Sequence, residues 1–186
     1  GKRRCYARLT VPFLPPQFDV HPFFILVKES KQNKNYSVFI LKIEKEVAIS
    51  KDEKQNIEAY MALGKIYVYL EVYDKAYSFY MEALKLAEKN KLINKIGLIN
   101  ESLGNLQFQL GNYEKSNQLY ALSIKCFQKT NNFDEIIKVK GSIAVIDIKT
   151  GHVQRAIESL ISIKNTKQLN PDVKAATLLT LGNIYL

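Results

Sequence analysis

Cysteine and long apolar runs are scarce in this chain of 186 residues. Its two cysteines, Cys5 and Cys126, are too few for a disulfide framework or for a zinc site with four cysteine ligands. No uninterrupted apolar run reaches the roughly 18 residues of an ordinary membrane-spanning helix. With 47% hydrophobic and 24% charged residues, the composition is that of a folded globular protein, which excludes a mainly disordered or collagen-like chain.

The residues that carry most enzyme chemistry are also few and scattered. His21 and His152 are the only histidines, and neither has a cysteine or carboxylate at the spacing of a metal site. No cysteine–histidine pair suggests a nucleophile, and no glycine-rich loop precedes a helix as in a phosphate site. Adjacent carboxylates beginning at Asp52 and at Asp134 stand at expected helix starts, and we interpret them as caps. The sequence therefore predicts no enzyme, no metal and no cofactor.

Acidic residues are outnumbered by basic ones, which leaves a net charge of +9. Residues 1–34 contribute +5 of this excess and the other 152 residues contribute +4. A basic segment can attract nucleic acid or anionic lipid, but 23 of the 27 basic residues are lysines, whereas base and phosphate recognition favours arginine. We therefore interpret the charge mainly as a solubilising surface. Nucleic-acid or membrane association through the N-terminal segment is the less favoured alternative.

Proline is nearly confined to the start of the chain. Prolines at 12, 15, 16 and 22 exclude a regular helix in residues 1–22, where we expect a basic, irregular arm without a recognisable export signal. A cytoplasmic location is therefore expected. Residues 23–54 are expected to form a degenerate or capping helical pair, with helices over 23–31 and 35–49. From residue 55 to 186 the only proline is Pro171, at an expected helix start, so alternating helices and turns are predicted throughout.

Three segments of this second part align at a spacing of 40 residues. Glycine or alanine stands at 64, 104 and 144, and a small residue stands at 76, 116 and 156. A fourth match ends with Gly182 in its first half. Repeats of this kind predict stacked helical hairpins. The expected repeats cover residues 57–92, 97–132 and 137–170, followed by the first helix of a truncated fourth over 173–186.

The small residues have a physical role that needs no family name. Two antiparallel helices approach most closely where both carry a small residue, and large residues such as Tyr60, Tyr67 and Tyr80 then fill the space around that point. Gly111 and Gly151 fall between the helices, where a left-handed residue ends the first one. Burying one such tyrosine or leucine contributes roughly 1.5–3 kcal/mol. A single hairpin cannot cover its own apolar face, so neighbours must stack.

The quoted residues resemble the tetratricopeptide repeat, whose pattern joins a large residue, Leu-Gly and Tyr to a later Ala, aromatic and Ala. The 40-residue spacing is similar to long-repeat members such as kinesin light chains, LGN-type adaptors and bacterial peptide-sensing regulators. The resemblance implies an all-α fold, a right-handed superhelical solenoid of helical hairpins over residues 55–186. The first repeat carries the pattern at Tyr60, Leu63, Gly64, Tyr67, Ala76, Tyr80 and Ala83, the second keeps Leu103, Gly104 and Tyr120, and the third is degenerate.

In such a stack the first helices line a concave groove, and the register predicts which residues face it. The expected function is a scaffold that binds a peptide or partner protein there, with amides gripping the backbone and lysines meeting acidic groups. A peptide-sensing regulatory domain of a larger protein is the alternative, and the C-terminal helix is a possible self-association surface. The predicted groove residues are Met61, Lys65, Tyr69, Glu101, Asn105, Phe108, Gln109, Lys138, Ile148, Lys149 and Asn183.

Overall fold

The computed structural model describes residues 36–166 and 170–185, and every regular element in these ranges is a helix. The expected arm over 1–22 and the expected helix over 23–31 lie outside the described residues. The predicted helix over 35–49 is found almost unchanged as α2. The helices are α2 (Tyr36–Ile49), α3 (Glu53–Tyr69), α4 (Tyr73–Lys89), α5 (Ile93–Gln109), α6 (Tyr113–Lys129), α7 (Phe133–Lys149), α8 (Val153–Lys164) and α9 (Pro171–Tyr185).

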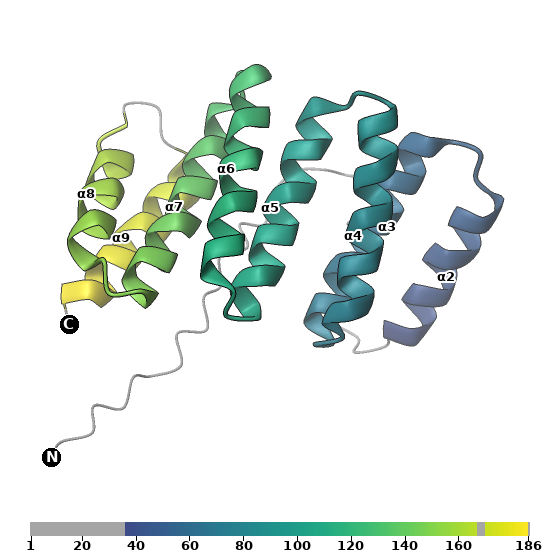
Figure 1. The fold of residues 1–186 in the computed structure, drawn as a ribbon, viewed down its shortest axis with the longest axis horizontal. Helices are drawn as coiled ribbons and strands as arrows, with labels where there is room; N and C mark the ends of the chain where they lie inside the picture. The colour runs from purple at the N-terminus through teal and green to yellow at the C-terminus, as the bar shows by residue number, and fades with distance from the viewer. Residues whose placement is uncertain (1–35, 167–169, 186) are drawn as a thin grey trace, which may run out of the picture.

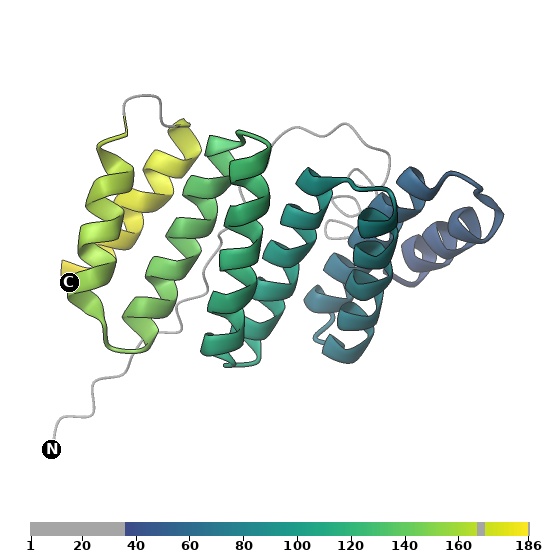
Figure 2. The ribbon, with the colours of Figure 1, turned by 45° about the horizontal axis from the view of Figure 1, so that its top comes forward.

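The helices form a row of antiparallel hairpins that stack side by side (Figures 1 and 2). Helices α3, α5 and α7 are the first helices of the three complete hairpins, and α4, α6 and α8 are their second helices. Helix α2 lies at one end of the row and α9 at the other (Figure 1). The predicted all-helical array of stacked helix pairs is therefore confirmed.

Five tight turns join the helices from α3 to α8, and each uses one residue with a positive φ angle. Gly111 (φ 77°) and Gly151 (φ 84°) occupy this position after α5 and α7, as the sequence predicts. After α3 the same position holds Glu71, with a φ angle of 60°. The turn after α3 thus adopts the same left-handed backbone conformation, although it has Glu71 in place of the glycine that adopts this conformation most easily.

The predicted contacts between small residues hold each hairpin together. A Cβ atom placed on Gly64 would lie 2.5 Å from the Tyr80 ring, and one on Gly104 would lie 2.6 Å from the Tyr120 ring. Beside the second contact, the Ser116 hydroxyl donates a 2.8 Å hydrogen bond to the Gly104 carbonyl. Glycine is therefore required because an aromatic ring occupies the place of a side chain. The third hairpin instead packs Ala144 in one cluster with Leu160, Ala156 and Leu181.

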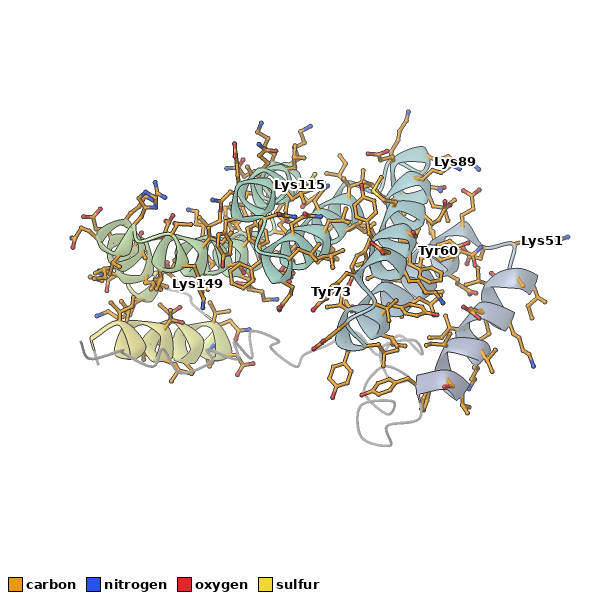
Figure 3. All side chains as sticks on the ribbon, turned by 60° about the horizontal axis from the view of Figure 1, so that its bottom comes forward. Lys51, Tyr60, Tyr73, Lys89, Lys115 and Lys149 are labelled. Carbon is orange, nitrogen blue, oxygen red and sulfur yellow. The ribbon has the colours of Figure 1, made fainter. Side chains whose placement is uncertain are left out.

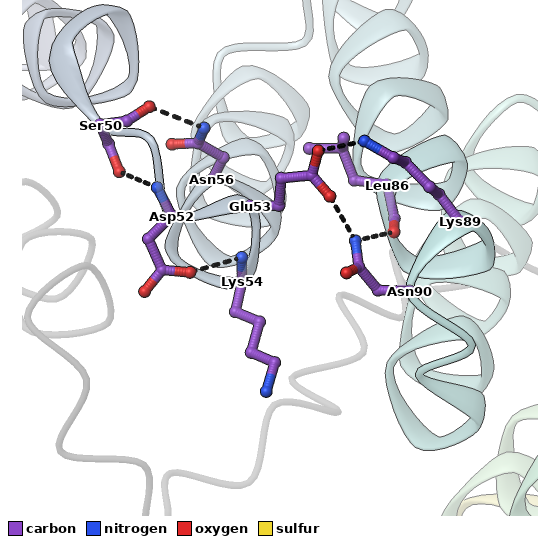
Figure 4. A network of polar contacts seen from close by, with 8 residues as sticks. All are labelled: Ser50, Asp52, Glu53, Lys54, Asn56, Leu86, Lys89 and Asn90. Carbon is purple, nitrogen blue, oxygen red and sulfur yellow. Dashed lines mark hydrogen bonds and ion pairs between the residues drawn. The ribbon is translucent and has the colours of Figure 1, made fainter.

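The helix starts differ in how they are capped. The Asp52 carboxylate accepts hydrogen bonds from the Lys54 and Gln55 backbone N–H groups, so its interpretation as a cap is correct (Figure 4). Glu53, next to it, contacts Lys89 and accepts a 2.7 Å hydrogen bond from Asn90, which ties α3 to the end of α4.

The capping role expected of Asp134 and Glu135 is wrong. The N-cap residue of α7 is Asn132, and its side chain makes no capping hydrogen bond. The two carboxylates lie two and three positions later, in the first turn, where the positive end of the helix dipole still favours them. Glu135 accepts a 2.6 Å hydrogen bond from Lys138 instead of capping the backbone.

An ion pair between a buried carboxylate and an exposed arginine crosses the third hairpin. Asp147 is only 3% exposed, and its two carboxylate oxygens accept hydrogen bonds from Arg155, one of them at 2.9 Å from Nε. The carboxylate raises the pKa of the Arg155 guanidinium. The same position of the preceding hairpin holds Gln107, also buried, which accepts a 2.9 Å hydrogen bond from Asn112. The second and third hairpins thus pair the buried polar side chain at this position with different partners.

Candidate interaction surface on the first helices

Polar side chains connect successive first helices. Glu58 of α3 forms an ion pair with Lys95 of α5, and Asn132, just before α7, donates a 3.2 Å hydrogen bond to Asn94 of α5. These contacts bring three helices from separate hairpins into one surface. We call this the first-helix face and define it by the predicted groove residues on α3, α5 and α7.

Glu101 lies near the middle of the first-helix face. Burial, together with the nearby charge of Glu135, raises the pKa of its carboxyl group to about 7. The cationic side chains of Lys138 on α7 and Lys65 on α3 act in the opposite direction. The structure therefore brings together Lys65, Glu101 and Lys138, which the sequence analysis had placed on three different helices.

Asn105 is fixed by a contact from the second helix of its own hairpin. The buried Tyr120 hydroxyl donates a 2.6 Å hydrogen bond to Asn105 Oδ1, and burial raises the pKa of Tyr120 to about 12. The tyrosine therefore donates throughout the neutral pH range and holds the amide in one orientation. Within the described part of the chain the Asn105 nitrogen makes no hydrogen bond, so it remains able to donate to a peptide carbonyl.

The other predicted groove residues divide by exposure. Lys65, Gln109 and Lys149 are exposed, and Tyr69 is 54% exposed with its ring 5.2 Å from that of Tyr36. Figure 3 shows the labelled Lys115 on α6 and Lys149 on α7 on opposite sides of the row. The exposed members therefore offer cationic, amide and aromatic groups on the side away from the second helices.

Three half-buried groove residues also contact neighbouring side chains within the protein. Phe108 lies 5.7 Å from the Tyr113 ring, and Ile148 packs against the cluster that contains Leu160. Lys138 is also half-buried and pairs with Glu135 at 2.6 Å. These residues can present only an edge of their side chains to a partner.

Met61 does not lie where the register places it. It is 6% exposed and belongs to the buried cluster that joins α2, α3, α4 and α5. The apolar thioether is removed from water there, so Met61 supports the surface from beneath and does not line it. Asn183 lies in α9, and its side chain is not among those described.

Sequence reasoning missed the ladder of charges between first helices. Glu58 and Lys95 are separated by 37 positions, and so are Glu101 and Lys138. A search for opposite charges at slightly less than the repeat length would have found both pairs. The spacing is shorter than 40 because the contact crosses from one hairpin to the next at a different height along the helices.

We expect Glu101→Gln to stabilise the protein at pH 8 by about 1–2 kcal/mol, after allowance for partial exposure. The raised pKa means that folding favours the neutral carboxyl group. The stability gained by burying the neutral Glu101 carboxyl group is fully present below pH 4.5 and is lost as the pH rises through about 7. Urea unfolding at pH 4.5, 6, 7 and 8 measures the difference between the two proteins. Equal stability of variant and parent at every pH would contradict the assignment.

The described residues contain no group of three histidine, cysteine or acidic side chains that could hold a metal ion. Among these same residues, no helix has the length and apolar character needed to span a membrane. What the surface offers is a set of hydrogen-bond donors, acceptors and charges suited to binding.

Comparison with known proteins gives one family match and several structural ones. Residues 57–90 match the tetratricopeptide repeat, and this stretch contains most of α3 and α4. A comparison with curated proteins gives no significant match. The structure of BtubC (BKLC) from P. vanneervenii is similar with a TM-score of 0.74 and 20% identity, covering 88% of this chain and 70% of that one.

Two further structures share the arrangement. The apo form of RapI has a TM-score of 0.73 and 14% identity over 88% of this chain, which spans 47% of RapI. A putative kinesin light chain from Podosopora anserina with nearly identical TPR-like repeats has a TM-score of 0.66 and 16% identity, covering 90% and 88% of the two chains. At such identities the likeness shows a shared fold. The chain therefore contains one segment, residues 57–90, that matches the tetratricopeptide repeat, within a row of helical hairpins whose fold these structures share.

Proposed function

We propose that this protein is an interaction module that binds a segment of a partner polypeptide along its first-helix face. Tetratricopeptide repeat domains in general bind proteins or peptides. The observation that carries the proposal is the convergence of Lys65, Glu101 and Lys138 from three successive first helices.

The chemistry of the face suits a peptide backbone with mixed side chains. Asn105 presents a donor in a fixed orientation, and Gln109 adds an exposed amide one turn further along α5. Lys65 and Lys149 supply positive charge at separate points along the row, while Glu101 and Glu135 supply acceptors between them. A segment that spans the hairpins would therefore meet alternating amide, cationic and anionic groups.

Substituting the exposed polar residues of the face should weaken such binding at least tenfold. We would select peptides from a random library on the intact chain and measure their affinity by fluorescence anisotropy. The test variant replaces Lys65, Gln109 and Lys149 with alanine, one residue on each first helix. All three are exposed, so the fold is expected to survive and the lost affinity reports lost contacts.

A control of the same composition is available on the second helices. Lys85, Gln128 and Lys164 are exposed on α4, α6 and α8, and replacing all three with alanine removes the same charges from the other side. The control should change affinity less than twofold. Equal losses in the two variants would contradict the proposal, because only net charge would then matter.

A further inference from the structure

A hollow of about 500 Å³, open to solvent, lies between the start of α6 and the turn that joins α7 to α8. It belongs to the second-helix side and shares no residue with the first-helix face. Its lining combines the Tyr113 ring and the small Ala121 side chain with polar and charged side chains, among them Glu114, Asn117, His152 and Arg155.

The equivalent place between α4 and α6, forty positions earlier in the sequence, is filled by side chains of the protein itself. Between α4 and α6 the Lys115 ammonium lies 6.0 Å from the centre of the Tyr77 ring. Forty positions later, Asn117 replaces Tyr77, Ala121 replaces Met81 and Arg155 replaces Lys115. The hollow therefore exists because α6 lacks the counterparts of the Tyr77 ring and the Met81 thioether. Helix α8 still carries a cationic side chain, Arg155, at the position of Lys115.

The Arg155 guanidinium is held beside the hollow by the buried Asp147 carboxylate. Arg155 donates two hydrogen bonds to Asp147, which is fully enclosed, and the arginine side chain itself remains largely exposed. A guanidinium fixed in this way needs little ordering to meet a ligand. Its plane is also a better partner for an aromatic face than the ammonium of Lys115.

We propose that the hollow binds an aromatic side chain, tyrosine or phenylalanine, from a partner polypeptide. The ring takes the place of the missing counterpart of Tyr77, with its negative face toward Arg155 and its edge on Ala121 and Tyr113. This is charge complementarity between a cation and a ring quadrupole, as Lys115 and Tyr77 already show within the chain. Glu114 at the rim disfavours an anionic ligand, while Asn117 and His152 can pair with a phenolic hydroxyl.

The test is a titration of the isotope-labelled intact chain with N-acetyl-tyrosine amide, followed by NMR. We expect saturable shifts of the Asn117 side-chain amide and of the Gly151 and His152 backbone amides. N-acetyl-cyclohexylalanine amide, which has similar bulk without a π face, should bind at least threefold more weakly. Equal binding of the two probes would overturn the proposal, because it would show a nonspecific apolar hollow.

A filled variant separates the site from nonspecific binding. Asn117→Tyr with Ala121→Met copies the residues of the first hairpin, so it is expected to fold and to lose at least tenfold in probe affinity. Gln128→Tyr adds a ring at an exposed position further along α6 and should leave probe affinity unchanged. Undiminished binding to the filled variant, or no saturable shift on the parent chain, would also overturn the proposal. The first-helix triple variant should bind the probe normally, which separates this site from the proposed function.

Discussion

Replacing Gly104 with alanine should lower the free energy of unfolding by about 2–3 kcal/mol. The new Cβ atom would lie 2.6 Å from Cε1 of Tyr120, closer than two carbon atoms can approach. The ring cannot move aside easily, because it is 1% exposed and its hydroxyl is bonded to Asn105. Urea denaturation followed by circular dichroism measures the loss.

Two companion variants show whether the ring is the cause. No atom lies within 4 Å of a Cβ placed on Gly182, so Gly182→Ala should be neutral or slightly stabilising. Adding Tyr120→Leu to Gly104→Ala reproduces the Ala144 and Leu160 combination of the third hairpin. The double variant should therefore be more stable than the two single losses predict, by about 1 kcal/mol. A Gly104→Ala effect as small as that of Gly182→Ala would show that Tyr120 does not impose the glycine.

Replacing Arg155 with methionine should lower the free energy of unfolding at pH 7, because it leaves the buried Asp147 carboxylate without its partner. Methionine keeps much of the packing of the arginine stem but removes both hydrogen bonds to Asp147. The carboxylate would then be enclosed without its partner, at a cost larger than the net contribution of the intact pair. Thermal unfolding followed by circular dichroism, compared with the parent chain, gives the size of the loss.

The preceding hairpin supplies the control for this pair. Asp147→Gln installs the residue found at the same position as Gln107, which is buried without any charge. In that background Arg155→Met should cost clearly less stability than in the parent chain, because no ion is left behind. An equal cost in both backgrounds would assign the effect to lost packing by the arginine stem.

The sequence predicted the contacts within each hairpin because they repeat. Gly64 with Ala76 and Gly104 with Ser116 have the same spacing, so one rule placed both pairs of small residues, and Gly111 and Gly151 marked the turns. Only the structure shows that the Tyr80 and Tyr120 rings lie directly on the two glycines. The capping role of Asp134 was wrong for a local reason: adjacent carboxylates fit the N-cap and the first turn equally well. Only the backbone conformation decides between these two positions.

The first-helix face was harder to predict because its contacts cross from one hairpin to the next. The repeat register assigns a residue to one side of its helix, but it does not give the tilt between neighbouring hairpins. Met61 illustrates the difference, since the register placed it in the groove and the structure places it in the core. The hydrogen bond from Tyr120 to Asn105 and the ion pair between Arg155 and Asp147 each occur in a single repeat, so a periodic pattern cannot predict them.

The exchange of glycine with tyrosine for alanine with leucine has a consequence for how the hairpins diverged. Changing only the glycine produces a clash, and changing only the tyrosine leaves a void. Either single step weakens the hairpin, so an ancestral repeat could move between the two solutions only at a temporary loss of stability. A redesigned hairpin of this kind should therefore exchange the residues at positions 144 and 160 together.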